Sequence, residues 1–381
     1  MQVVFYILFS TFIQMRILVL TFAAFIFSTV VYSQGCCSGG SGSPIAGGAS
    51  QGVLQDRQVE VSANYQYMST NKFYVKDRDT VSMFDNLSSN YLYFRLAYGL
   101  TKNLTMSVES GYFINKTQIG INRVDTFASK GFGDLILFPR YDVLNRTTET
   151  RRTEITLGLG LKIPLGMHDD STVVYTNPTT GKKYYTTSPP TVQATNGSND
   201  FIFYGFFYRG FPLKKFSLFS NVIYIRKGWN SLGQKFGDYS SVGLFASKTF
   251  FKKLGVTLQV KGEWVGEMQY DKNVDMLALY NVDVTSTGGR KIFFVPQLNF
   301  THNNFTIYAL SEIPLYQYVN GTQVGSQHQI TAGVAYRFNA YKSRIKKSSA
   351  GEAYMCPMKC ESGGSDKPGK CSVCGMELNK Q

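Results

Sequence analysis

Four cysteines near the C-terminus have the spacing needed for metal chemistry. They occur as Cys356-x3-Cys360-x10-Cys371-x2-Cys374. Two close pairs joined by a short loop can place four thiolates around one tetrahedral ion. Soft thiolate ligands select Cu(I), Zn(II) or toxic ions such as Cd(II) and Hg(II). We therefore predict a soft-metal site at these cysteines, with disulfide pairing in an oxidising compartment as the alternative.

The residues around the cysteines fit such a site. Met358 and Met376 are suitable thioether ligands for Cu(I), although packing against the turn would also explain them. Gly375 follows Cys374 and permits the tight turn that directs backbone N–H groups toward the sulfurs. A segment this short has almost no hydrophobic core, so a metal ion or a disulfide must supply its stability.

Residues 354–378 resemble the heavy-metal-binding domain found on copper and other heavy-metal exporters and efflux adaptors. The similarity rests on Cys356-Pro357-Met358, on the sequence DKPGKC that ends at Cys371, and on Cys374-Gly375-Met376. Where many members of that family have His-Pro, this chain has Lys359-Cys360, which adds a fourth thiolate. The resemblance implies a role in copper or other heavy-metal handling and a periplasmic metal-efflux component as a partner.

A second pair of thiols lies near the N-terminus. Cys36 and Cys37 are adjacent within the Gly/Ser-rich stretch 34–56, which we expect to be a flexible segment. Adjacent cysteines rarely form a disulfide with each other. The pair is a possible additional soft-metal site, and the alternatives are an exposed pair without a role or part of a plug inside a barrel.

Residues 1–33 have the pattern of an export signal. Arg16 supplies positive charge before the apolar stretch 17–32, and the mature chain is expected to begin at Gln34. Met1 and Met15 are both possible starts. A membrane anchor helix is the alternative, but sixteen apolar residues are short for a span.

Between residues 58 and 338 the sequence alternates between apolar and polar residues in segments of about ten residues, which predicts β-strands. Residues 153–163 alternate most regularly, with Leu and Ile opposite Glu, Thr, Gly and Lys. The segment at 201–210 is apolar at nearly every position, so its orientation is not predicted. The twelve predicted strands are about 58–68, 91–100, 103–113, 132–143, 153–163, 201–210, 216–226, 239–250, 255–265, 291–301, 304–315 and 327–338.

The last predicted strand carries a recognisable pattern. Its Thr331, Gly333, Tyr336 and Phe338 resemble the closing strand that bacterial outer-membrane β-barrels present to the barrel-insertion machinery. The basic stretch 339–353 that follows reads as a linker.

The connections between the predicted strands alternate between short turns and mostly long loops, the longest near 165–200. This alternation is typical of outer-membrane proteins with short periplasmic turns and long extracellular loops. We therefore predict an all-β fold, a transmembrane antiparallel up-and-down barrel of about 12 strands, in the outer membrane of a Gram-negative bacterium with both termini periplasmic. A soluble β-sandwich is the alternative; strands of about ten residues and charged polar faces favour the barrel and its lipid surroundings.

Charged residues of both signs lie on the polar sides of the predicted strands. Cross-strand ion pairs that fill a narrow barrel explain them better than acid–base catalysis, and no Ser/His/Asp arrangement is apparent, so we expect a protein that is not an enzyme. The predicted inward charges are Glu60, Arg95, Glu109, Asp134, Arg140, Asp142, Glu154, Lys162, Lys261, Glu263, Glu312 and Arg337.

The chain has a formal net charge of +14, yet its basic residues are dispersed and no nucleic-acid-binding motif is present. We expect no nucleic-acid partner. Two further stretches, Gly131-Phe132-Gly133-Asp134 and GLGLKIPLG at 158–166, with Arg140-Tyr141 between them, resemble the outer-membrane family named for the MetA pathway of phenol degradation, or putative transporters. That resemblance implies an outer-membrane channel.

The expected organisation is a signal peptide at 1–33, the flexible segment at 34–56, the barrel at 57–338, the linker at 339–353 and the metal-binding domain at 354–381. The expected function is a channel or transporter-like barrel with a periplasmic soft-metal-binding tail. The alternatives are a membrane-anchored metal-buffering protein without transport and a passive porin for small organic molecules.

Overall fold

The computed structural model describes residues 52–121, 126–148, 150–251, 253–276 and 283–340, together with 354–355, 364–365, 369 and 378–380. Within these residues, twelve long strands form one closed antiparallel barrel, as predicted. They are β1 (Gln58–Thr70), β4 (Phe84–Gly99), β5 (Leu104–Gly120), β6 (Phe127–Thr147), β7 (Arg152–Pro164), β10 (Asp200–Phe211), β11 (Phe216–Arg226), β13 (Tyr239–Phe250), β14 (Leu254–Val265), β16 (Gly289–His302), β17 (Phe305–Val324) and β18 (His328–Asn339). Each coincides with one of the predicted strands, and several are longer than expected.

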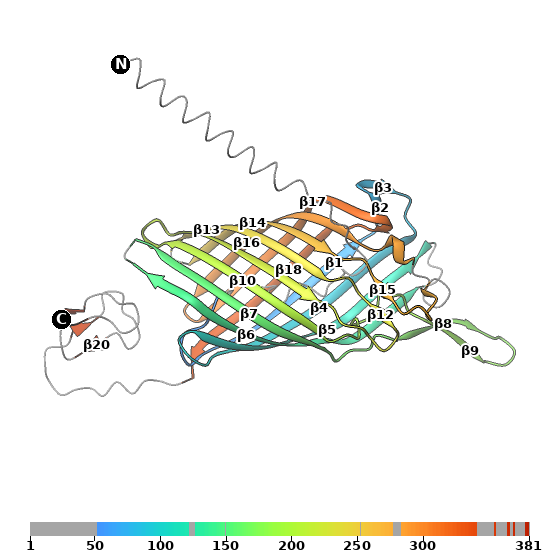
Figure 1. The fold of residues 1–381 in the computed structure, drawn as a ribbon, viewed down its shortest axis with the longest axis horizontal. Coiled ribbons are helices and arrows are strands. Elements are labelled where there is room, and N and C mark those ends of the chain that lie inside the picture. Colours follow the sequence, from blue (N-terminus) through green and yellow to red (C-terminus); the bar gives the residue numbers. More distant parts are fainter. Residues whose placement is uncertain are drawn as a thin grey trace, which may run out of the picture. The chain divides into compact units, whose positions relative to one another are not determined.

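The barrel is closed because the last strand pairs with the first. Every barrel strand pairs with its neighbours in chain order, and β18 pairs with β1 so that Gln58 lies opposite Asn339. The ring therefore has no free edge, which satisfies the backbone hydrogen bonds along the whole wall. Figure 1 shows the strands inclined to the barrel axis, as closure of a sheet requires.

Short connections lie at one end of the barrel, here termed the short-turn end, where β1 also begins and β18 ends. They are residues 100–103, 148–151, 212–215, 251–253 and 303–304. At the last of these, Asn303 has a φ of 51°, a left-handed conformation that asparagine tolerates better than most residues.

The opposite end, termed the long-loop end, carries the longer connections 71–83, 121–126, 165–199, 227–238 and 266–288. The sixth connection, 325–327, was expected to be long but has only three residues, because β17 continues to Val324. The extra length of β17 pairs with a small hairpin, with Val324 opposite Phe73. The smaller elements are β2 (Phe73–Lys76), β3 (Arg78–Thr80), β8 (Ser171–Thr176), β9 (Lys183–Thr187), β12 (Gln234–Lys235), β15 (Gln269–Tyr270), η3 (Val284–Ser286) and, in a short turn, η2 (Pro212–Lys214).

The outer surface of the wall is apolar. On β7, Leu157 and Leu159 are 53% and 63% exposed, while Thr156 and Gly158, which alternate with them, are buried. The same alternation runs along β4, where Phe94 and Leu96 are exposed. An apolar exterior around a polar interior is the reverse of a soluble sandwich and is the arrangement of a membrane-spanning barrel.

The described chain before the first strand enters the barrel interior. Leu54 is only 3% exposed, and its backbone N–H donates to Thr105 Oγ1 on β5 at 2.7 Å. Within the described residues, no helix has the length and apolarity to cross a membrane.

Candidate lumen and candidate metal site

Five charged side chains alternate in sign across neighbouring strands near the short-turn end. In order around the wall they are Arg337 (β18), Glu60 (β1), Arg95 (β4), Glu109 (β5) and Arg140 (β6). Arg337 Nε lies 2.5 Å from Glu60 Oε2. Arg95 lies 3.6 Å from Glu60 Oε1 and 3.4 Å from Glu109 Oε1. We term this set the short-turn cluster; its alternation compensates charges that would be costly to bury alone.

A second set, the long-loop cluster, crosses β6, β7 and β10 at the other end. Lys162 Nζ lies 2.7 Å from Asp134 Oδ2 and 3.0 Å from Asp200 Oδ2. Lys227, just after β11, lies 3.1 Å from Asp200 Oδ2. The order around the wall is again alternating, Asp134, Lys162, Asp200, Lys227. Asp200 and Lys227 were not among the predicted charges, because they stand at a strand end and in a loop.

A third group lies on the opposite wall. Lys261 on β14 lies 2.6 Å from Glu312 Oε2 on β17 and 2.9 Å from Glu263 Oε1. The hydroxyl of Tyr239 on β13 donates to the same Glu263 oxygen at 2.9 Å. Each carboxylate in this group therefore has a cation.

The twelve predicted charges all lie on the inward side of their strands, and all but Glu312 and Arg337 are buried. Eight of the twelve form ion pairs across strands, which confirms the prediction for them: Glu60, Arg95, Glu109, Arg337, Asp134, Lys162, Lys261 and Glu312. Buried charges mean that water reaches little of the wall at these levels. The described lumen is therefore filled with packed side chains at the two clusters rather than open along its length.

One part of the lumen wall is apolar, which the sequence did not predict. The sixth predicted strand, β10, presents Ile202, Tyr204 and Phe206 inward and Phe201 and Phe203 outward. The residues buried together in this apolar wall are Ile136, Phe138, Ile202, Tyr204, Phe206, Ile223 and Ile225. Strand β10 is apolar on both faces because one face is part of the apolar outer surface of the barrel and the other packs within this cluster.

Part of the longest loop folds into the long-loop end of the barrel. Residues 188–198, here termed the inserted segment, include Val192 and Ser198, both 0% exposed. Lys116 Nζ on β5 donates to the carbonyl of Gln193 at 2.8 Å, and the hydroxyl of Ser129 on β6 donates to the carbonyl of Val192.

Further contacts hold the inserted segment against inward side chains. The Thr195 hydroxyl donates to Asp134 of the long-loop cluster. Ala194 packs with the inward rings of Tyr91, Tyr93 and Phe113. The inserted segment thus narrows the lumen at the long-loop end, where it contacts the long-loop cluster.

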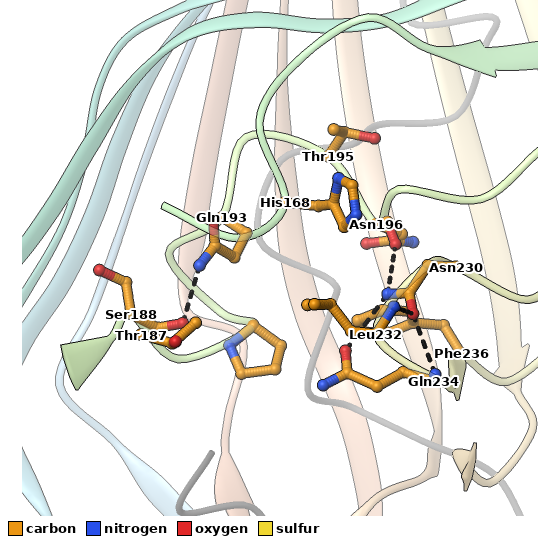
Figure 2. Close-up of a pocket in the computed structure, with 11 residues that line it drawn as sticks. His168, Thr187, Ser188, Gln193, Thr195, Asn196, Asn230, Leu232, Gln234 and Phe236 are labelled. Atoms are coloured by element: carbon orange, nitrogen blue, oxygen red, sulfur yellow. Dashed lines mark hydrogen bonds between the residues drawn. The ribbon is translucent and has the colours of Figure 1, made fainter. Parts of the chain in front are cut away.

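A small polar pocket lies beside the inserted segment (Figure 2). Asn230 Nδ2 donates to the carbonyl of Asn196 at 3.0 Å, and Gln193 Nε2 donates to the carbonyl of Ser188 at 2.8 Å. His168 lines the pocket and has Nε2 2.8 Å from Ser231 Oγ. Most groups around the pocket are neutral amides and hydroxyls. In the portion of the chain that the structure describes, no group of three or more His, Cys, Asp or Glu side chains is placed to hold a metal ion.

The C-terminal tail contains a small three-stranded sheet, ordered β20-β19-β21. The strands are β19 (Tyr354–Met355), β20 (Gly364–Ser365) and β21 (Asn379–Lys380). Tyr354 lies opposite both Ser365 and Lys380, so the beginning and the end of the tail are paired. In addition, the backbone N–H of Leu378 donates to the carbonyl of Gly369 at 2.8 Å.

These pairings close two stretches of chain at their ends. The β19–β20 pair closes 356–363, which contains the first predicted cysteine pair, and the Leu378–Gly369 hydrogen bond closes 370–377, which contains the second. The predicted ligands themselves lie outside the described residues, as do the N-terminal thiols: Cys356, Met358, Cys360, Cys371, Cys374, Met376, Cys36 and Cys37.

The four positions of the closing-strand pattern have distinct places on β18. Thr331 is buried inside, whereas the rings of Tyr336 and Phe338 stack on the outside, with centroids 5.5 Å apart. A Cβ at Gly333 would lie 2.5 Å from the ring of Tyr308 on β17. Glycine at this position therefore makes room for an inward tyrosine.

Comparison with protein-family models finds one match, to the family described as heavy metal binding domain, over residues 353–381. This supports metal binding by the tail. A comparison with curated proteins finds no match.

Solved structures are similar to the barrel part of this chain. An outer membrane channel from Pseudomonas putida F1 is 15% identical, with a TM-score of 0.56, and the alignment covers 77% of this chain and 99% of that one. The KdgM porin in complex with oligogalacturonate is 9% identical over 73% of this chain and 99% of that one, with a TM-score of 0.37. The β domain of the Bordetella autotransporter BrkA is 10% identical over 74% and 100%, with a TM-score of 0.41. The first of these shows that the chain has the fold of an outer-membrane channel.

Proposed function

We propose that this protein is an outer-membrane barrel that handles soft heavy-metal ions, with copper the first candidate, through a periplasmic metal-binding tail. The observation that carries the proposal is the match of residues 353–381 to the heavy-metal-binding family on the same chain as a closed, outwardly apolar barrel. The tail would capture ions and pass them to the barrel or to a periplasmic efflux component.

The topology of the barrel supports a periplasmic position for the tail. Outer-membrane barrels place short turns in the periplasm and long loops outside. The short-turn end is also where Gln58 and Asn339 pair, so the chain enters and leaves the barrel there. On this assignment 1–33 is a cleaved export signal, both termini are periplasmic, and 339–353 links the barrel to the tail. The outward Tyr336 and Phe338 on β18 are the side chains that the insertion machinery would meet.

The four cysteines are proposed as the ligands, in two pairs that the closed stretches 356–363 and 370–377 would bring together. An all-thiolate site suits Cu(I) or Zn(II), and equally Cd(II) or Hg(II). Met358 and Met376 would add thioether ligands specific to Cu(I). Cys36 and Cys37 would be additional thiols at the same face of the membrane.

A second candidate function is metal buffering by a barrel that serves only as an anchor. The packed lumen favours it, because the short-turn and long-loop clusters leave buried side chains where an open channel would expose them. On either reading, the barrel carries no catalytic role.

The test is a metal titration of the full-length protein in detergent under reducing conditions. Cu(I) and Zn(II) would compete with a chelator for wild type, for single Cys→Ser variants at 356, 360, 371 and 374, and for a variant lacking 341–381. We expect one tightly bound ion per chain in the wild type and loss of this binding in each single variant. The ion that binds most tightly would identify the metal that the protein handles. Full affinity in two of the single variants would contradict the four-thiolate site. Conductance in planar bilayers then separates transport from anchoring.

A further inference from the structure

A cation flanked by two aromatic residues faces outward at the long-loop rim of the barrel. Arg290 is the second residue of β16. The next residue, Lys291, is inside the barrel and 4% exposed, and Ile292 after it is exposed on the outer wall. Strand alternation therefore places Arg290 on the outer wall, where it is half-buried.

Two aromatic residues flank this arginine. Arg290 lies directly opposite Trp264 on β14 and Tyr318 on β17, and residues paired in this way share a face of the sheet. The Arg290 guanidinium carbon lies 4.8 Å from the centroid of the Tyr318 ring. A Cβ at Gly262 would lie 2.8 Å from Trp264 Cη2, so the indole covers Gly262, away from the rim. Trp264, Arg290 and Tyr318 thus form a row with a cation at its centre, here termed the rim row.

The charge of Arg290 has no acidic partner in the described chain. No carboxylate there forms an ion pair with it, whereas the inward Arg95, Lys162 and Lys261 each have a carboxylate partner within 4 Å. An arginine on the lipid face is costly at the middle of a bilayer and much less so near its surface. Stacking on Tyr318 occupies one face of the guanidinium and leaves its N–H edges available for a bidentate acceptor. Phosphate has that geometry.

We infer that the rim row binds a phosphate of the phosphorylated glycolipid in the outer leaflet. Trp264 and Tyr318 would lie at the boundary between acyl chains and head groups, where amphipathic rings are favoured. Arg290 would bind the head-group phosphate, and Ile292 below it would contact the acyl chains. This inference rests on the proposed outer-membrane location, with the long-loop end outside.

The test measures lipid binding by the full-length protein in detergent, as the rise of its thermal unfolding midpoint. The probes are purified lipid A, its dephosphorylated form and inorganic phosphate. The variants are Arg290→Gln, Arg290→Lys and, as a matched control, Arg78→Gln. Arg78 lies exposed on β3 at the same end, outside the rim row.

Lipid A should raise the midpoint of wild type and Arg78→Gln equally, with apparent affinity about tenfold weaker in Arg290→Gln. If Arg290→Gln does not fold, Arg290→Lys replaces it and should bind more weakly than wild type. An equal shift with dephosphorylated lipid, with free phosphate, or in the Arg290 variants would overturn the inference. Membrane fractionation of the wild type tests the proposed outer-membrane location independently of lipid binding. Recovery outside the outer membrane would defeat the proposed location, whereas correct location with unchanged lipid binding would defeat only this inference.

Discussion

Arg95 shows how a single residue holds the interior together. It is 8% exposed and lies between Glu60 and Glu109, with distances of 3.6 and 3.4 Å to their carboxylate oxygens. Those two carboxylates are 0% and 1% exposed. Removing the cation between them would leave two buried negative charges facing each other across β4.

We therefore expect Arg95→Met to lower the free energy of unfolding by about 3–5 kcal/mol, because one member of a buried ion pair is lost while its partners stay buried. Equilibrium unfolding in denaturant with lipid vesicles measures this. The matched control is Lys72→Gln, which breaks the exposed 3.1 Å Lys72–Asp79 pair and should change the value by less than about 1 kcal/mol. If Arg95→Met, like the control, lowered the free energy of unfolding by less than about 1 kcal/mol, the barrel would not depend on this interior charge.

Which charges face inward was predictable residue by residue, because the period of a strand is two. Glu154 and Lys162 are an even number of positions apart on β7, and both are inside. The same rule could not predict the position of Lys227, because this residue lies beyond the end of β11 and its contact with Asp200 depends on the tertiary fold. The structure also explains a glycine of the GLGLKIPLG stretch, since a Cβ at Gly160 would lie 2.9 Å from the ring of Phe138.

At the scale of elements, the alternating and apolar segments located all twelve strands, but they could not assign the faces of β10. Strand β10 is apolar on both sides, and only the packing of Ile202 and Tyr204 inside the barrel decides the question. Nor could sequence locate the inserted segment. Its residues are mostly small and polar, as in any solvated loop, and their burial comes from partners such as Lys116 on another strand.

The inserted segment should limit passage through the barrel. Deleting 191–196 removes the residues that contact Gln118, Lys116 and Asp134 and should raise single-channel conductance severalfold in planar bilayers. Shortening the exposed β8–β9 turn at 178–180 is the control, since that turn lies outside the barrel interior, and conductance should not change. Equal conductance in the wild type and the 191–196 deletion would place the restriction elsewhere in the lumen.

At the scale of the whole molecule, the chain combines a self-contained ring with a terminal metal-binding segment. The ring closes through β1 and β18, and the last closing pair is Gln58 with Asn339. Cysteine spacing predicted metal binding by the tail, because ligand spacing is local, and the match to the heavy-metal-binding family supports that prediction. The tail's metal and its exchange partner depend on chemistry beyond the chain, and so no pattern in the sequence specifies them.

Deleting 341–381 should separate the two functions. Because every barrel strand pair lies before residue 340, the truncated chain should fold with an unchanged unfolding midpoint in detergent, while metal binding falls from one ion per chain to none. In cells, tolerance to the preferred metal should fall to the level of the full-length chain with all four tail cysteines changed to serine. That variant separates metal capture from any contribution of chain length. Unchanged tolerance in both strains, with the barrel present in normal amounts, would mean that the tail does not serve metal handling. The barrel would then act as a channel for other small molecules, with its conductance set by the inserted segment and the interior ion pairs.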